Sequence, residues 1–200
     1  GGAICLNLPK SFSSEDIYKE LNYKSLHGQT KDALSKMQIG NWEYDIVEAG
    51  YKCNMTDIVA SIGLVELERY DNDTLVRRKQ IFDAYSQAFQ NETWAEVPIY
   101  KEQHRCSSFH AYLLRIKNIN ETQRNAIIQN IFEQDVAVNV HFKPLPMMTF
   151  YKNAGYNIQD YPIAYDNYSR EISLPVYYTL SDENLNIVIQ AVKTAVARVL

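Results

Sequence analysis

Apolar residues recur at helical spacing in several stretches of this chain, and short β-prone runs lie between them. The stretch SSEDIYKEL, residues 13–21, is typical of a helix, and Ser14 can cap it. A further helix should begin after Asn54 or Thr56, since both residue types favour the N-cap position. The apolar residues of that helix are Ile58, Ile62 and Val65 on one face, with Leu64 and Leu67 beside them.

The segment 68–73 is rich in charge and interrupts this apolar pattern. A helix of about 17 residues should follow it, because apolar side chains again recur on one face. These side chains are Leu75, Phe82 and Phe89, with Ile81 and Tyr85 adjacent. We therefore expect a boundary near residue 70, which gives domains 1–70 and 71–200.

Strand and helix patterns alternate through the second domain. The strand-like runs are 109–117, 136–142 and 171–177, and the helical runs are 120–135, 162–170 and 181–200. Residues 143–156 should form a loop, because Pro144 and Pro146 disfavour regular structure. This order predicts a compact α/β domain.

The first domain is less regular. Residues 1–7 are expected to form a strand, His27 and Gly28 a turn, and the residues up to 36 a short helix. Natural N-termini rarely start inside a sheet element, so we expect this chain to be the back part of a longer protein.

Composition narrows the class of protein. Lys and Arg number 20 against 24 Asp and Glu, a net charge of −4, which argues against a general nucleic-acid binder. The chain has no run of about 18 apolar residues, so we expect no membrane span. Cys5, Cys53 and Cys106 are widely spaced and odd in number, which favours a reducing cytoplasm over disulfides or a metal site.

The sequence GYKCNMTD, residues 50–57, places a lysine, an asparagine and an aspartate at the mouth of an apolar helix. Two interpretations are open. Either these residues only cap the helix, or Lys52 and Asn54 join the free N–H groups of the helix to hold an anion. Nucleotide-binding glycine loops and hydrolase motifs do not occur in the chain, so neither class of site is predicted.

The order of six motifs adds a resemblance. GGAICLN, SLHGQTKDA, VEAGYKCNMTDIVASIGLVEL, FHAYLLRI, VNVHFKPL and EISLPVYYTLSDE occur in this order over essentially all 200 residues. The chain thus resembles the DegT/DnrJ/EryC1/StrS family of pyridoxal-phosphate-dependent (PLP-dependent) sugar aminotransferases. The middle motif and VNVHFKPL are the most specific.

This resemblance implies an α/β protein of PLP-dependent transferase fold type I. It also implies a homodimer with active sites at the subunit interface, which aminates a nucleotide-linked keto-deoxysugar with glutamate as amino donor. The pathway would be surface polysaccharide synthesis, such as that of lipopolysaccharide, or amino-sugar synthesis. The lysine that holds the cofactor as a Schiff base would precede Gly1, so we expect no catalytic residue in this chain. Residues 1–70 would end the large domain, and 71–200 would form the small C-terminal domain.

The resemblance also suggests binding residues. Where the family often has Gly-Tyr-Asn-Tyr-Arg, this chain has GYKCN, so Lys52 replaces the asparagine and Asn54 replaces the arginine. The asparagine is associated with the cofactor phosphate of the other subunit, and Lys52 and Asn54 are accordingly expected to bind that phosphate.

The family places the loop after VNVHF over the sugar pocket. His141, Lys143 and Tyr151 are therefore expected to bind substrate, although a histidine on a strand can equally be a packing residue. Many family members have a further histidine where this chain has Pro146, so one usual substrate contact is expected to be absent.

Two other functions remain open at this stage. One is a sugar dehydratase of the same family that uses pyridoxamine phosphate, in which histidine replaces the Schiff-base lysine. The other is a non-catalytic interaction module without cofactor.

Overall fold

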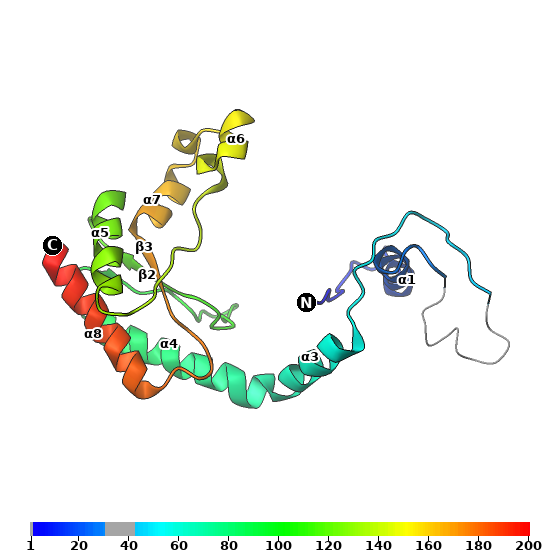
Figure 1. Ribbon diagram of the computed structural model, residues 1–200, viewed down its shortest axis with the longest axis horizontal. Coiled ribbons are helices and arrows are strands. Elements are labelled where there is room, and N and C mark those ends of the chain that lie inside the picture. The colour runs from blue at the N-terminus through cyan, green and yellow to red at the C-terminus, as the bar shows by residue number, and fades with distance from the viewer. Residues whose placement is uncertain (1, 31–42) are drawn as a thin grey trace. The chain divides into compact units, whose positions relative to one another are not determined.

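The computed structural model describes residues 2–30 and 43–200, and the chain divides into two compact units, Gly1–Glu68 and Arg69–Leu200 (Figure 1). The first unit contains α1 (Ser14–Ser25) and most of α3 (Asp57–Arg69). The expected cap of α1 was wrong by one residue, because Ser13 is the N-cap and its hydroxyl accepts from the amide of Asp16 at 3.2 Å. The apolar side chains of α3, such as Ile58 and Ile62, are exposed.

The strand expected at residues 1–7 is not found in residues 2–7. A β-strand needs a hydrogen-bonded neighbour, and no described segment pairs with these residues. The turn at His27 and Gly28 is confirmed, since both residues have positive φ, 58° and 72°. The short helix expected up to residue 36 lies outside the described residues.

The second unit begins with the π-helix η1 (Tyr70–Thr74), which leads into α4. Its remaining elements are α4 (Leu75–Phe89), β1 (Ala95–Glu96), β2 (Tyr112–Ile116), α5 (Glu121–Phe132), η2 (Leu145–Met147), α6 (Thr149–Asn153), η3 (Ile158–Asp160), α7 (Pro162–Arg170), β3 (Glu171–Leu174) and α8 (Asp182–Val199). The strands form an antiparallel sheet in the order β1-β2-β3.

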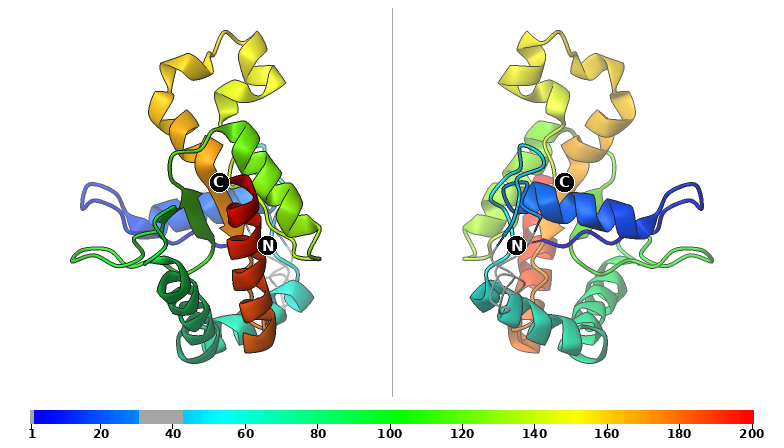
Figure 2. Two further views of the ribbon diagram at one scale, coloured as in Figure 1. Left: turned by 90° about the vertical axis from the view of Figure 1, so that its left-hand side faces the viewer. Right: turned by 90° about the vertical axis from the view of Figure 1, so that its right-hand side faces the viewer.

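Period-two alternation along β2 gives the sheet two different faces. Tyr112, Leu114 and Ile116 are fully buried, whereas Leu113 and Arg115 between them are half-buried. The buried face packs on apolar side chains of α4, α5 and α8, and α5 and α8 lie side by side (Figure 2). The predicted stripe of α4 is confirmed at Ile81, Phe82, Tyr85 and Phe89, which are buried.

The strand expected at 136–142 was wrong. Only Asn139 pairs with β3, through two backbone bonds to Ser173 of 3.1 and 2.7 Å. At the next two residues, Val140 and His141, the backbone amides donate to side-chain oxygens instead of to backbone carbonyls of β3. The Asn139 side chain accepts from the amide of Val140 at 2.7 Å, and the Glu171 carboxylate accepts from the amide of His141 at 3.0 Å. The pairing with β3 therefore stops after one residue.

The loop expected at 143–156 also proved partly helical. Leu145–Met147 form η2, which tolerates Pro146 because the first amides of a helical turn have no partner within it. Thr149–Asn153 form α6, which contains no proline. Among residues 2–30 and 43–200, no helix combines the length and the hydropathy that a bilayer crossing requires.

Candidate functional site

In the first unit, the segment Gly50–Asn54 lies along the C-terminal end of α1. Tyr51 donates its amide to the carbonyl of Lys24 at 2.6 Å, and the amide of His27 donates to the carbonyl of Tyr51 at 2.8 Å. The amides of Cys53 and Asn54 both donate to the carbonyl of Ser25, at 3.0 and 3.1 Å. Backbone bonds rather than side-chain packing therefore fix the position of Lys52 and Asn54.

Two glycines make this arrangement possible. A Cβ atom on Gly50 would lie 2.2 Å from the amide nitrogen of Gly28 and 2.8 Å from the carbonyl oxygen of Tyr23. A Cβ atom on Gly28 would lie 1.9 Å from the carbonyl oxygen of Glu48, and its φ of +72° also favours glycine. The two segments thus approach more closely than any residue with a side chain would allow.

Lys52 and Asn54 contact each other at the end of this segment. The ammonium of Lys52 donates to Oδ1 of Asn54 at 2.5 Å, and both residues are exposed. Because Oδ1 already accepts from Lys52, Asn54 can bind a further acceptor through its two Nδ2 protons. A cation and an amide donor side by side, just before the first residue of α3, suit a phosphate dianion. The residues present therefore fit the phosphate of pyridoxal phosphate.

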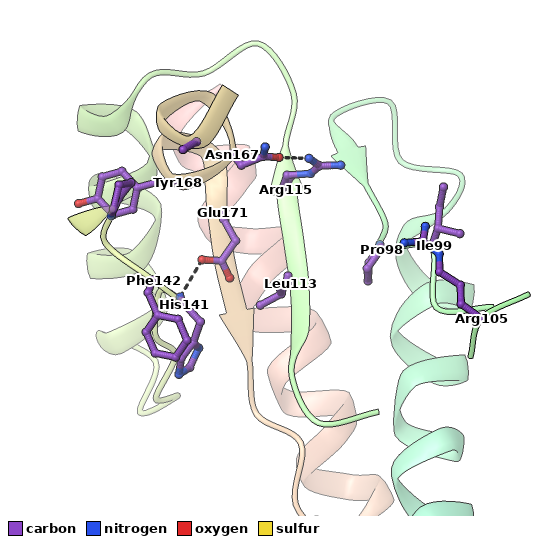
Figure 3. Close-up of a pocket in the computed structure, with 12 residues that line it drawn as sticks. Pro98, Ile99, Arg105, Leu113, Arg115, His141, Phe142, Asn167, Tyr168 and Glu171 are labelled. Carbon is purple, nitrogen blue, oxygen red and sulfur yellow. Dashed lines mark hydrogen bonds between the residues drawn. The ribbon is translucent and has the colours of Figure 1, made fainter. Parts of the chain in front are cut away.

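In the second unit, His141 lines a cavity of about 500 Å³ beside the second face of the sheet (Figure 3). Leu113 and Arg115 of β2 and Glu171 of β3 also line it, because alternation directs them away from the core. Phe142, Asn167 and Tyr168 also line this cavity. The cavity thus combines apolar surface with a few polar groups, as ligand sites do.

His141 is held by two buried polar residues of β3. Its Nδ1 lies 2.8 Å from the hydroxyl of Ser173, and its backbone amide donates to the Glu171 carboxylate at 3.0 Å. The Ser173 hydroxyl in turn donates to the other oxygen of Glu171. Ser173 and Glu171 are each only 4% exposed. Burial raises the pKa of Glu171, while its contacts with Ser173, the His141 amide and Arg124 oppose that rise.

Arg115, one of the two arginines in the cavity wall, is neutralised by its neighbours, and the other, Arg105, pairs with Glu102 at 2.6 Å. Arg115 donates to Asn167 and to Glu96, and Glu96 also accepts from Arg170 at 3.2 Å. Arg170 makes a further ion pair with Asp166. Because Arg115 and Arg170 face Glu96 and Asp166, and Arg105 pairs with Glu102, these arginines give orientation rather than a net positive charge.

Tyr151 lines a second cavity, of about 390 Å³, which shares Pro144 and Ala164 with the first. Tyr156 and Tyr161 also line this second cavity. Lys143 is exposed and lines neither cavity. The structure therefore brings His141 and Tyr151 to adjoining cavities and leaves Lys143 on the surface next to them.

Sequence reasoning missed Glu171 and Ser173. Their signal was the alternation in EISL, which places both polar residues on the face opposite Ile172 and Leu174. Within residues 2–30 and 43–200, no cluster of three or more metal-ligating side chains occurs.

The chain was compared with known proteins. A family model described as the DegT/DnrJ/EryC1/StrS aminotransferase family matches residues 1–193. Spr1654 of Streptococcus pneumoniae, a candidate sugar aminotransferase solved in its PMP form, matches with a TM-score of 0.88 and 46% identity, over 96% of this chain and 48% of its own. The spore coat polysaccharide biosynthesis protein SpsC of Bacillus subtilis is 34% identical over 91% of this chain and 47% of its own length. The UDP-4-amino-4,6-dideoxy-N-acetyl-beta-L-altrosamine transaminase of Campylobacter jejuni is 24% identical over 90% of this chain and 44% of its own.

This chain spans about half the length of the relatives it matches. The structural match confirms the predicted fold class, that of PLP-dependent transferase fold type I. Spr1654 is also solved in its PLP form, which matches with a TM-score of 0.87, so PLP dependence is supported for the family.

Proposed function

This chain belongs to the DegT/DnrJ/EryC1/StrS aminotransferase family, and on that premise we propose that it is part of an aminotransferase for a nucleotide-linked keto-deoxysugar. The observation that carries the proposal is the match to Spr1654 at 46% identity over 96% of the chain. The name of the Campylobacter jejuni relative supports a nucleotide-linked substrate, and that of SpsC supports surface polysaccharide synthesis. Glutamate is the proposed amino donor, and the cytoplasm the proposed location.

Lys52 and Asn54 are proposed to bind the cofactor phosphate of the partner subunit in a homodimer. Lys52 supplies a positive charge and Asn54 supplies amide donors, and charge-assisted bonds of this kind are the stronger ones. When bound, pyridoxal phosphate supplies the electron sink for amino transfer. The amides of Cys53 and Asn54 donate to Ser25 and hold the backbone of this segment before the cofactor arrives, which lowers the entropic cost of binding it.

His141, Tyr151 and Lys143 are proposed to bind the substrate. His141 offers a ring nitrogen to a sugar hydroxyl in the first cavity, and Tyr151 offers an aromatic face in the adjoining one. Lys143, exposed beside them, can meet a pyrophosphate as a point charge.

Residues 1–70 are proposed to end the large domain and 71–200 to form the small domain of the complete enzyme. The cofactor lysine of the complete enzyme is proposed to precede Gly1. The 200-residue chain alone should therefore show no amino transfer when it is mixed with PLP, glutamate and a keto sugar. Turnover, with cofactor attached to one lysine of this chain, would contradict this.

The phosphate site is tested with Lys52→Ala combined with Asn54→Ala in the complete enzyme. Hydrogen bonds to charged groups contribute about 1.5–3 kcal/mol, so cofactor affinity should fall by roughly tenfold or more. Cofactor absorbance after dialysis measures the affinity. The matched control is Lys19→Ala combined with Asn22→Ala, which removes an exposed lysine and asparagine from α1. Equal cofactor retention in both double variants would show that Lys52 and Asn54 only cap the helix and do not bind the cofactor phosphate.

The substrate site is tested with His141→Ala combined with Lys143→Ala. We expect a higher KM for nucleotide-linked keto sugars, with a smaller effect on free sugars. His104→Ala combined with Lys117→Ala is the control, because both residues are exposed and line neither cavity. If KM and kcat for every nucleotide sugar stay unchanged, this site assignment is wrong.

A further inference from the structure

Glu171, Ser173 and the ring of His141 form one continuous chain of hydrogen bonds. Glu171 and His141 line the first cavity, whereas Ser173 and His141 line a neighbouring cavity of about 550 Å³. The carboxylate and the hydroxyl are both 4% exposed, so bulk water does not compete for either group. Ser173 is fixed by its backbone pairing with Asn139, at 3.1 and 2.7 Å. The start of β3 is fixed by the buried guanidinium of Arg124, which donates to the carbonyl oxygen of Glu171 at 3.1 Å. The chain of bonds is therefore built on rigid backbone.

The number of protons shared by Glu171, Ser173 and His141 determines which group donates in each of these hydrogen bonds. When the Glu171 carboxylate is ionised it can only accept, so the single hydroxyl proton of Ser173 is then committed to Glu171. The Ser173 oxygen can then take part in its 2.8 Å contact with Nδ1 of His141 only as an acceptor. Nδ1 must therefore carry the proton of the neutral imidazole, and Nε2 must be unprotonated.

Resting on the proposed substrate role of His141, we propose that Glu171 and Ser173 are positioning residues that hold His141 as the Nδ1–H tautomer, so that Nε2 accepts a hydrogen bond. The site would then select a ligand group that donates, such as a sugar hydroxyl. It would disfavour an analogue that presents only an acceptor there, such as a methyl ether at the same oxygen. Discrimination of this kind arises because an acceptor that loses water on binding and gains no donor from the ligand raises the free energy of the complex.

The tautomer can be measured without any ligand. The complete enzyme is labelled with ¹⁵N-histidine and studied by NMR at about pH 8, where an ordinary histidine, with a pKa near 6.5, is neutral. The signals of His141 are identified by their loss in His141→Gln. We expect the Nδ1–H form in the wild type, and a shift toward the Nε2–H form in Ser173→Ala. Ser173→Thr, which keeps the hydroxyl, should restore the wild-type form.

The matched control is Ser169→Ala. Ser169 is also buried, at 6% exposed, and its hydroxyl donates to the carbonyl oxygen of Asp166 rather than to the His141 network. This variant should leave the tautomer of His141 unchanged, and circular dichroism checks that each variant is folded. An Nε2–H form in the wild type, or the same tautomer in wild type and Ser173→Ala, would overturn the proposal.

A second measurement separates this proposal from the function it rests on. Affinities for a nucleotide-linked sugar and its methyl ether are compared in wild type and Ser173→Ala. A smaller difference between the two ligands in the variant supports both proposals. If the tautomer changes as expected but the affinities do not, the positioning role stands and the substrate role of His141 is wrong.

Discussion

Replacing Gly50 by alanine should displace the segment that carries Lys52 and Asn54. The new Cβ would lie 2.2 Å from the amide nitrogen of Gly28, 2.7 Å from the carbonyl carbon of His27 and 2.8 Å from the carbonyl oxygen of Tyr23. All three are backbone atoms, so no side-chain rotation can relieve the overlap. The segment must move away from the end of α1.

The cost follows from the bonds that this movement breaks. Four backbone bonds anchor the segment. They are Tyr51 N to Lys24 O at 2.6 Å, His27 N to Tyr51 O at 2.8 Å, and Cys53 N and Asn54 N to Ser25 O at 3.0 and 3.1 Å. At about 0.5–1.5 kcal/mol each, losing most of them destabilises this local structure by about 1–4 kcal/mol. Amide hydrogen exchange measured by mass spectrometry should then be roughly fivefold faster or more in this segment.

Gly63→Ala is the matched control in the same unit. Gly63 lies in α3, and nothing lies within 4 Å of a Cβ built on it. Alanine in a helix interior is more stable than glycine by about 0.5–1 kcal/mol, so exchange in α3 should slow or stay the same. If Gly50→Ala and Gly63→Ala give the same exchange rates around Lys52, the close approach of Gly50 to Gly28 does not hold this segment.

Three further predictions concern the second unit. Asn120→Ala removes a capping box, in which Asn120 accepts from the amide of Gln123 at 2.9 Å and the Gln123 side chain accepts in return at 3.0 Å. Urea unfolding should show a loss of about 1 kcal/mol, and no loss would contradict the cap. Burial raises the pKa of Glu171, so the folded state binds this proton more tightly than the unfolded state, where the pKa is about 4.3. Stability of the wild type relative to Glu171→Gln should therefore fall as the pH rises above about 4, and a rise would contradict this sign. Burial raises the pKa of Tyr112 to about 12, so Tyr112→Phe should remove a late phase from the ultraviolet titration of the folded protein. An unchanged late phase would contradict this.

In the second unit, α4, α5, α7 and α8 could be predicted because their apolar spacing, and in α5 and α8 their caps, are local. Asn120 begins α5 and Ser181 begins α8, and each side chain accepts from an amide three residues later. The strand at 136–142 could not be judged from local pattern. Its end depends on the Glu171 carboxylate, 30 residues later, which accepts from the amide of His141 in place of a backbone carbonyl.

The candidate site was predictable only in part, for the same physical reason. Motif resemblance indicated His141 and Tyr151, and both line cavities. Glu171 and Ser173 join His141 only because Asn139 pairs with the edge of β3, a contact between segments far apart in the sequence. The approach of Gly50 to Gly28 is likewise a contact between backbones, to which no local pattern points.

The most direct test of the proposed function is the product formed by the complete enzyme. The enzyme, PLP, glutamate and a nucleotide-linked keto-deoxysugar are incubated together, and the sugar product is identified by mass spectrometry. The proposal predicts an amine in place of the keto group, with one 2-oxoglutarate released for each amine formed. A sugar that has lost its hydroxyl without gaining nitrogen would indicate a dehydratase and contradict the proposal, as would no reaction with any nucleotide-linked keto sugar.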